Sequence, residues 1–158
     1  EEQRPDAPEP GTKPPGTAPA VPPAPAVPCP APDAGAAARL AGERNVWLCT
    51  VRANGTPHVA PVWFVHDAGR WWIGTDERAV KVRSIRTTPR VSLALEDGDR
   101  PLVAEGTARV LTAPFPPRVV TAFHEKYGWD VSAERPGSGA RLLLEVRTLR
   151  WLLAGTAQ

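Results

Sequence analysis

The main regularity along the chain is a set of short apolar runs, several of which alternate with polar residues, and most end at residues that favour turns. Alternation of apolar and polar residues with a period of two indicates β-strands, because successive side chains of a strand point to opposite faces of the sheet. Six runs are also rich in aromatic and β-branched residues, which strands favour. These predicted strands cover residues 45–52, 56–67, 70–75, 91–97, 101–112 and 141–153.

Turn residues indicate how neighbouring strands are connected. Asn54 and Gly55 predict a two-residue type I′ hairpin, because both central positions of that turn need positive φ. Residues 67–69 and 98–99 are further turn signals, so the strands are expected to form an antiparallel meander. Pro57 and Pro61 cannot donate to a ladder. Their strand is therefore expected at an edge of the sheet, or broken where a ligand replaces a neighbouring strand.

Three other segments have helical patterns. Residues 34–44 are rich in alanine, and a second helix is expected to begin near Thr75 or Asp76, either of which is a good N-cap. The third helix, residues 118–127, is expected to end at Gly128. Its apolar face carries Val119, Val120, Phe123 and Tyr127. Six antiparallel strands with two or three short helices predict a barrel or sandwich of the α+β class, mainly β.

Composition divides the chain into two parts. Residues 1–33 hold 12 of the 20 prolines and no aromatic residue, which predicts a disordered Pro/Ala-rich arm. Residues 34–158 are long enough for one domain with its own core. Cys29 and Cys49 are expected to be free thiols in a reducing compartment. Because no apolar run is long enough to span a membrane and no signal peptide is evident, we expect a cytoplasmic protein.

A cluster of positive charge is the first candidate site. Five bases occur without an intervening acid, namely Arg78, Lys81, Arg83, Arg86 and Arg90. A cluster this short indicates a local anion site, whereas a nucleic-acid surface would need a longer basic stripe. Free N–H groups at the start of the adjacent predicted helix would favour a phosphate. The alternative is a solvated basic helix whose side chains pair with surface acids.

Aromatic residues supply the second kind of candidate. The chain has six tryptophans, and aromatic walls suit a planar ring, although most are expected in the core. Trp71 and Trp72 must point to opposite faces of a strand, so one faces solvent, a partner or a ligand unless both sheet faces are covered. The three histidines lack the spacing of a metal site, and no nucleophile motif is present. No catalytic residue is assigned, and a cofactor is expected to supply the reactivity.

The order of the motifs resembles that of a known family. The motifs are LCTVRANGTPHVAPVWFV, WWIGT, ERAVKVRSIRTTPRVSLALED, PLVAEGTARVL and FHEKYGWD. Together they span roughly residues 36–153 and are similar to the split β-barrels of the pyridoxamine 5′-phosphate oxidase-like superfamily. The branch they resemble most is that of the flavin/deazaflavin oxidoreductases, many of which use coenzyme F-420. The resemblance implies a six-stranded antiparallel split barrel that forms a homodimer, with the cofactor in a groove at the subunit interface.

The resemblance also implies which residues hold the cofactor. The residues expected along its ring are Pro61, Val62 and Trp63. The residues expected at its phosphate are Thr75, Arg78 and Lys81, with Arg83 and Ser84 as weaker candidates. Lys81 would be the main cation. Two positions depart from the pattern of relatives, because Val80 replaces a residue that is often basic and Ser84 replaces an asparagine.

The expected function is hydride transfer between F-420 or FMN and a small conjugated organic substrate. F-420 is favoured over FMN because 16 arginines against three lysines suggest a high-GC genome, in which the F-420 branch is common. Tyr127 could donate a proton, although its place on an apolar helical face favours a role in the core. One alternative is a non-catalytic protein that binds or carries a flavin, deazaflavin or haem. Another is a degenerate barrel whose arm and tryptophans contact other proteins.

Overall fold

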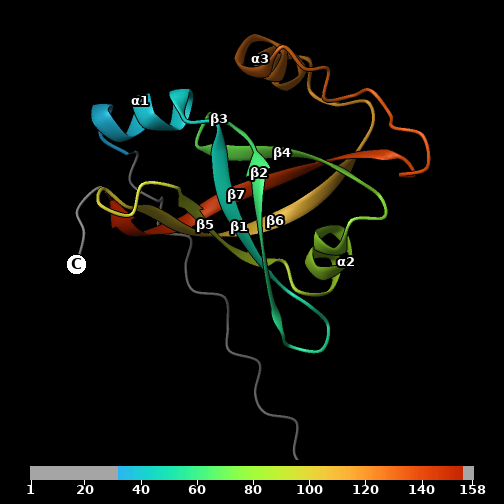
Figure 1. The fold of residues 1–158 in the computed structure, drawn as a ribbon, viewed down its shortest axis with the longest axis horizontal. Coiled ribbons are helices and arrows are strands. Elements are labelled where there is room, and N and C mark those ends of the chain that lie inside the picture. The colour runs from blue at the N-terminus through green and yellow to red at the C-terminus, as the bar shows by residue number, and fades with distance from the viewer. Residues whose placement is uncertain (1–31, 155–158) are drawn as a thin grey trace, which may run out of the picture.

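The computed structural model describes residues 32–154, so the predicted arm, apart from its last two residues, and Cys29 lie outside the described residues. Within the described residues, seven strands and three helices follow one another (Figure 1). The elements are α1 (Ala34–Gly42), β1 (Asn45–Val51), β2 (Pro57–Trp63), β3 (Val65–Asp67), β4 (Arg70–Asp76), α2 (Val80–Thr87), β5 (Arg90–Leu95), β6 (Leu102–Thr112), α3 (Pro117–Tyr127) and β7 (Arg141–Ala154). The antiparallel, mainly β architecture predicted from the alternation is confirmed.

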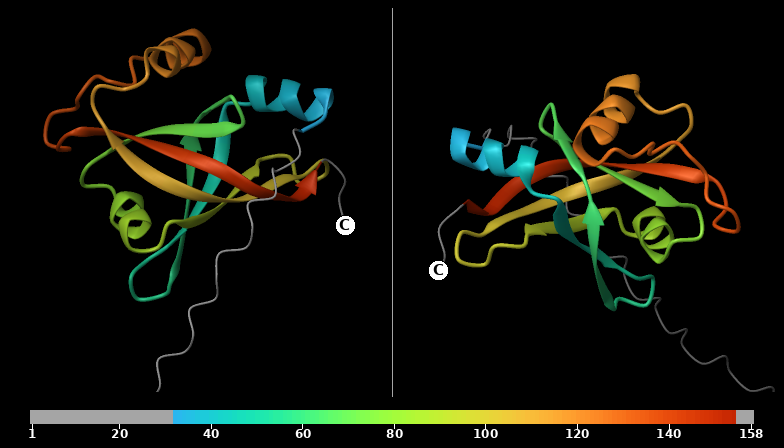
Figure 2. Two further views of the ribbon diagram at one scale, coloured as in Figure 1. Left: turned by 180° about the vertical axis from the view of Figure 1, so that it is seen from behind. Right: turned by 45° about the horizontal axis from the view of Figure 1, so that its top comes forward.

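The strands form one sheet in the order β2-β1-β5-β6-β7-β4-β3. β2 and β3 stand at opposite ends of this order, yet only Phe64 separates them in the chain. The continuous segment therefore bends and closes the sheet into a barrel, which Figure 2 shows from two further sides. The single strand predicted over residues 56–67 is two strands, because its first half pairs with β1 and its second half with β4.

The hairpin between β1 and β2 has a different turn from the predicted type I′. The N–H of Gly55 donates to the carbonyl of Arg52 at 2.8 Å, and the N–H of Arg52 donates to that of Thr56 at 2.9 Å. Of Asn54 and Gly55, only Gly55 has a positive φ, 85°. The Oδ1 atom of Asn54 instead accepts from the N–H of Thr56 at 3.1 Å. The connection is thus a three-residue loop with its glycine in the left-handed region.

The inside of the barrel holds the larger of two apolar clusters. Trp71, Ile73, Leu48 and Leu93 are among its members, and Leu40 of α1 packs against them. The indole N–H of Trp71 donates to the hydroxyl of Thr148 at 2.9 Å, so the polar atom of the largest buried side chain is satisfied.

The second apolar cluster lies outside the barrel, where α3 packs on β4 and β7. Trp72 and Leu143 point outward from these strands and meet Phe123 and Val131. Trp71 and Trp72 are consequently both buried, at 0% and 3% exposure, because both faces of β4 are covered. Gly128 ends α3 with a φ of 64°, as predicted. None of the helices within residues 32–154 is long and apolar enough to cross a membrane.

Candidate functional site

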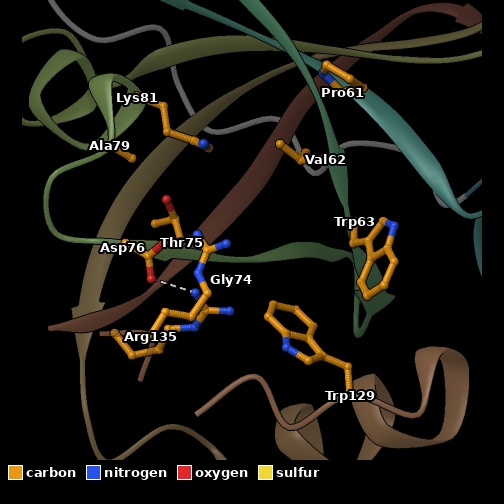
Figure 3. Close-up of a pocket in the computed structure, with 11 residues that line it drawn as sticks. Pro61, Val62, Trp63, Gly74, Thr75, Asp76, Ala79, Lys81, Trp129 and Arg135 are labelled. Atoms are coloured by element: carbon orange, nitrogen blue, oxygen red, sulfur yellow. Dashed lines mark hydrogen bonds and ion pairs between the residues drawn. The ribbon is translucent and has the colours of Figure 1, made fainter. Parts of the chain in front are cut away.

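A cavity of about 450 Å³ lies between β2, the end of β4, the start of α2 and the segment after α3 (Figure 3). Its volume is within the range of small-ligand sites. Figure 3 shows Trp63 and Trp129 on one side of it and Lys81, Asp76 and Arg135 on the other. The residues that line it are Pro61, Val62, Trp63, Gly74, Thr75, Asp76, Ala79, Lys81, Trp129, Arg135 and Arg141.

The β2 wall has one edge without a strand partner. β2 pairs with β1 on one side only and is the end of the strand order, as its two prolines predicted. Pro61 lies opposite Trp47 of β1 and has no N–H of its own to leave unpaired. Backbone groups of Val62 and Trp63 therefore border the cavity at an edge that a planar ligand can approach.

The aromatic end of the cavity is held rigidly. The ring of Trp63 stacks on that of Tyr127 with centroids 4.5 Å apart and planes 8° apart, and it meets Trp129 edge-on at 5.6 Å. The guanidinium of Arg44 lies 5.4 Å from the centroid of Trp63. Trp63 still exposes 40% of its surface. This indole is therefore fixed in orientation yet available to a ligand.

Tyr127 positions the bend that closes the barrel. Its hydroxyl accepts from the N–H of Phe64 at 3.0 Å and lies 2.8 Å from both the carbonyl of Phe64 and that of Arg44. Burial raises the pKa of Tyr127, and this outweighs the opposing effects of the hydrogen bond donated by the Phe64 N–H and of the charge of Arg44. The phenol thus remains protonated at neutral pH. Its place at the edge of the second apolar cluster agrees with the structural role expected from its helical face.

The polar end is organised by a buried carboxylate. Asp76 lies opposite Arg141 in the pairing of β4 with β7, and its Oδ1 accepts from Nη1 of Arg141 at 2.6 Å. Arg141 also donates from Nε to the carbonyl of Val131 at 2.9 Å, while Arg135 donates to Oδ2 of Asp76. Burial alone would raise the pKa of Asp76, but the hydrogen bonds from both arginines outweigh it and lower the pKa. Asp76 is therefore ionised at neutral pH.

Lys81 is the remaining cation of the cavity. It is half-buried, and within residues 32–154 it has no salt-bridge partner. Burial lowers the pKa of Lys81, with a smaller effect of Arg135 in the same direction, while Asp76 opposes the shift. Lys81, Arg135 and Arg141 against Asp76 give the lining two more positive than negative side chains. The cavity therefore favours an anionic group at this end.

The start of α2 adds to this preference, although it differs from the prediction. Thr75 and Asp76 are the last residues of β4, and the N-cap is Ala79. Asp76 does not cap the helix because its carboxylate is occupied by two arginines. No side chain of the described residues caps α2, and Ala79 and Lys81 line the cavity. The free N–H groups at the helix start thus lie near its polar end.

The structure brings together five of the eight predicted site residues. The five that line the cavity are Pro61, Val62, Trp63, Thr75 and Lys81. The second helix was expected to begin near Thr75 or Asp76, but Arg78 precedes α2, and its Nη1 donates to the carbonyl of Gly137 at 2.9 Å. Arg83 points to solvent, and Ser84 is buried at 3% exposure without lining the cavity.

Several lining residues were not singled out as site residues from the sequence. A Cβ on Gly74 would lie 2.5 Å from Cγ2 of Val131 and 2.8 Å from the Trp129 ring, so glycine permits this close packing. The acid that ends β4 and the base that begins β7, Asp76 and Arg141, could have been paired by matching strand ends. Arg135 lies in an irregular segment after α3, where no sequence periodicity indicates position.

Comparisons with known proteins agree with this architecture. The family model described as pyridoxamine 5′-phosphate oxidase matches residues 33–154. An F-420 reductase structure is 23% identical, with a TM-score of 0.58 over 70% of this chain and 90% of its own. HutZ, the haem storage protein of Vibrio cholerae, is 16% identical, with a TM-score of 0.65 over 80% of this chain and 98% of its own.

A third similar structure is a pyridoxamine 5′-phosphate oxidase-related, FMN-binding protein of Nostoc punctiforme. It is 18% identical, with a TM-score of 0.54 over 75% of this chain and 81% of its own. The comparison with curated proteins found no match. At these identities the structural likeness establishes the fold.

Proposed function

Since the chain belongs to the pyridoxamine 5′-phosphate oxidase family, we propose that it is an oxidoreductase whose cavity binds a flavin-type cofactor, either F-420 or FMN. The proposed reaction is hydride transfer between this cofactor and a small conjugated organic substrate. The observation that carries the proposal is the division of one cavity into an aromatic end and a cationic end.

The residues present fit such a group. F-420 and FMN each combine a planar tricyclic ring with a phosphate. The cavity offers an aromatic surface for the ring and a net positive charge for the phosphate. Trp63 and the edge of β2 would hold the ring, while Lys81, Arg135 and the start of α2 would hold the phosphate. The bound cofactor would supply the hydride chemistry.

The contribution of the chain itself is to bind, orient and exclude water. The stacking of Trp63 on Tyr127 fixes one wall, and Asp76 fixes the two arginines at the other end. The Tyr127 hydroxyl is engaged with backbone at the β2–β3 bend, so we do not assign it a proton-transfer role. Tyr127→Phe is expected to leave turnover unchanged if the protein stays folded.

We favour F-420 over FMN. The arginine-rich composition supports this choice, and an F-420 reductase is among the similar structures. The FMN-binding protein of similar fold supports the other choice. Titration with both cofactors separates the two.

A non-catalytic binding protein is the second candidate function. The haem storage protein HutZ has the same fold, and a fold does not determine a reaction. This candidate would be favoured if the purified protein retains a flavin, deazaflavin or haem that no added reductant reduces and no added acceptor oxidises.

We also propose that the protein acts as a homodimer, in which a second copy covers the open side of the cavity. The support is a group of exposed apolar side chains on the outer face of β1 and β2. Trp47 and Val59 are 42% and 55% exposed, and Trp47 lies opposite Pro61 of the cavity wall. Light scattering should give twice the chain mass, and Val59→Asp should lower it toward the monomer.

The deciding experiment is a titration of the protein with F-420 and with FMN, followed by tryptophan fluorescence. Lys81→Ala should weaken binding by about 10- to 100-fold, the value of a charge-assisted hydrogen bond. Arg83→Ala is the matched control, because Arg83 is an exposed base of the same helix outside the cavity. Binding of neither cofactor would contradict the proposal and leave a haem-binding or protein-interaction role.

A further inference from the structure

A pair of cavities lies apart from the first. Their volumes are about 390 Å³ and 690 Å³, and neither shares a lining residue with the first cavity. They meet at three residues that line both, Arg70 of β4, Arg109 of β6 and Glu145 of β7. We call the two together the arginine groove. The groove lies on the outer face of these three neighbouring strands.

A buried carboxylate holds the two shared arginines in place. Glu145 is 5% exposed, and its Oε1 accepts from Nη1 of Arg70 at 2.6 Å. Its Oε2 accepts from Nε and Nη2 of Arg109 at 3.0 and 2.7 Å. Both oxygens are therefore occupied by guanidinium groups. Two arginines on one carboxylate leave a net positive charge, with further N–H groups that have no partner among residues 32–154.

The strand pairing increases this surplus. Arg147 of β7 lies directly opposite Arg70 of β4, and both line the smaller cavity. Like charges directly opposite each other destabilise a sheet. Within residues 32–154, Arg147 makes no salt bridge. Since the pairing brings these cations together with one acid between them, the groove is electrostatically suited to an added anion.

The larger cavity supplies an apolar surface beside this charge. Trp72, at 3% exposure, lies on the same outward face of β4 as Arg70. Leu111, Phe115 and Pro116 add further apolar lining from β6 and the segment before α3. A cationic centre bordered by aromatic and aliphatic groups matches a ligand with a charged head and a flat apolar body.

We propose that the arginine groove is a second binding site, which takes an aromatic carboxylate. The carboxylate would contact the free N–H groups of Arg70 and Arg109, with Arg147 adding charge, and the ring would lie toward Trp72. Arginine suits this role because its planar donors match the two oxygens of a carboxylate. The proposal does not depend on the cofactor assigned to the first cavity.

The test uses 1-naphthoate as the probe, with calorimetry on the full chain. Arg109→Gln should weaken binding by about tenfold, the loss of one exposed charge-assisted hydrogen bond. Arg147→Gln should weaken it by a smaller factor, because it removes a nearby charge without removing a direct contact. Arg150→Gln is the matched control, because Arg150 is an exposed arginine of β7 that pairs with Glu105 outside the groove. It should leave the affinity unchanged, and so should Lys81→Ala in the first cavity.

Two further measurements locate the ligand. The indole N–H resonance of Trp72 should shift on addition of naphthoate, while that of Trp47, at the dimer face proposed above, should not. A neutral analogue, 1-naphthylmethanol, should bind at least about tenfold more weakly than naphthoate. The proposal is overturned if naphthoate fails to bind at millimolar concentration, binds the two groove variants as tightly as the wild type, or loses affinity in Lys81→Ala.

Discussion

The two faces of β4 divide stability from binding. Trp71 and Ile73 point into the barrel and are completely buried among apolar side chains. Trp72 and Gly74 point outward, where Trp72 borders the arginine groove and Gly74 borders the first cavity. One strand thus uses alternate residues for different purposes. Inward substitutions should lower the free energy of unfolding most, whereas outward ones should lower it less and also change binding.

The largest effect is expected inside the barrel. Trp71→Ala removes a side chain with 0% exposure and its hydrogen bond to Thr148, so the free energy of unfolding should fall by about 3–5 kcal/mol. Urea denaturation followed by circular dichroism measures this loss. If the free energy of unfolding of the variant is within about 1 kcal/mol of the wild-type value, the inward face is not the stabilising one and the comparison fails.

A smaller loss is expected at the outward end of β4. Asp76→Asn leaves the buried charge of Arg141 without its carboxylate, which should cost about 2–3 kcal/mol at neutral pH. The folded state lowers the pKa of Asp76, so this carboxylate stabilises the protein above its ordinary pKa, and the stabilisation is lost as the pH falls through the lower folded value. The difference between wild type and variant should therefore shrink toward acidic pH, and a constant difference would contradict the assignment.

Gly74→Ala should sharpen the comparison further. The added Cβ would lie within 3 Å of the side chains of Val131 and Trp129, so these groups must shift, and the cost should be about 1–2 kcal/mol. Because Trp129 lines the first cavity, cofactor affinity should fall even though the barrel stays folded. Gly42→Ala is the control, since a Cβ there meets nothing within 4 Å. Equal cofactor affinity in both variants would show that the Trp129 contact does not matter.

The smallest effect concerns the contact between α3 and the bend at Phe64. Lys126 of α3 donates to the carbonyl of Phe64 at 3.0 Å. Burial lowers the pKa of Lys126 to about 8. The charge of Arg44 acts in the same direction, and that of Glu43 opposes the shift. Because the folded pKa is below that of the unfolded chain, the charged form is disfavoured on folding. The stability of wild type relative to Lys126→Met should therefore rise between pH 7 and 9.5. A decrease over that interval would contradict the lowered pKa.

The sequence predicted the strands well because their periodicity is local, and it predicted contacts between distant segments less well. Alternation in residues 56–67 continues through Phe64, so it gives no sign that the strand changes partner there. Asp76 resembles a helix cap locally, but its partners follow 59 and 65 residues later. The burial of Trp72 depends on how α3 packs, which the strand pattern does not contain.

The candidate site shows the same division. Pro61, Val62, Trp63, Thr75 and Lys81 line one cavity, and they follow from two neighbouring motifs. Arg78 was expected at the phosphate near the start of a helix that begins at Thr75 or Asp76, but the helix begins after Arg78. Arg135 comes from a segment without regular structure. Its position is determined by Asp76, which no local pattern connects to it.

The bend at Phe64 also bears on the behaviour of the protein at high concentration. A sheet with free edges can add strands from other molecules and aggregate. Here the two edges are β2 and β3, separated in the chain by Phe64 alone. β3 has only three residues, and β2 carries Pro57 and Pro61, which cannot donate to an added strand. Pro61, which is one of the residues that line the cavity, therefore also protects the barrel from edge-to-edge polymerisation.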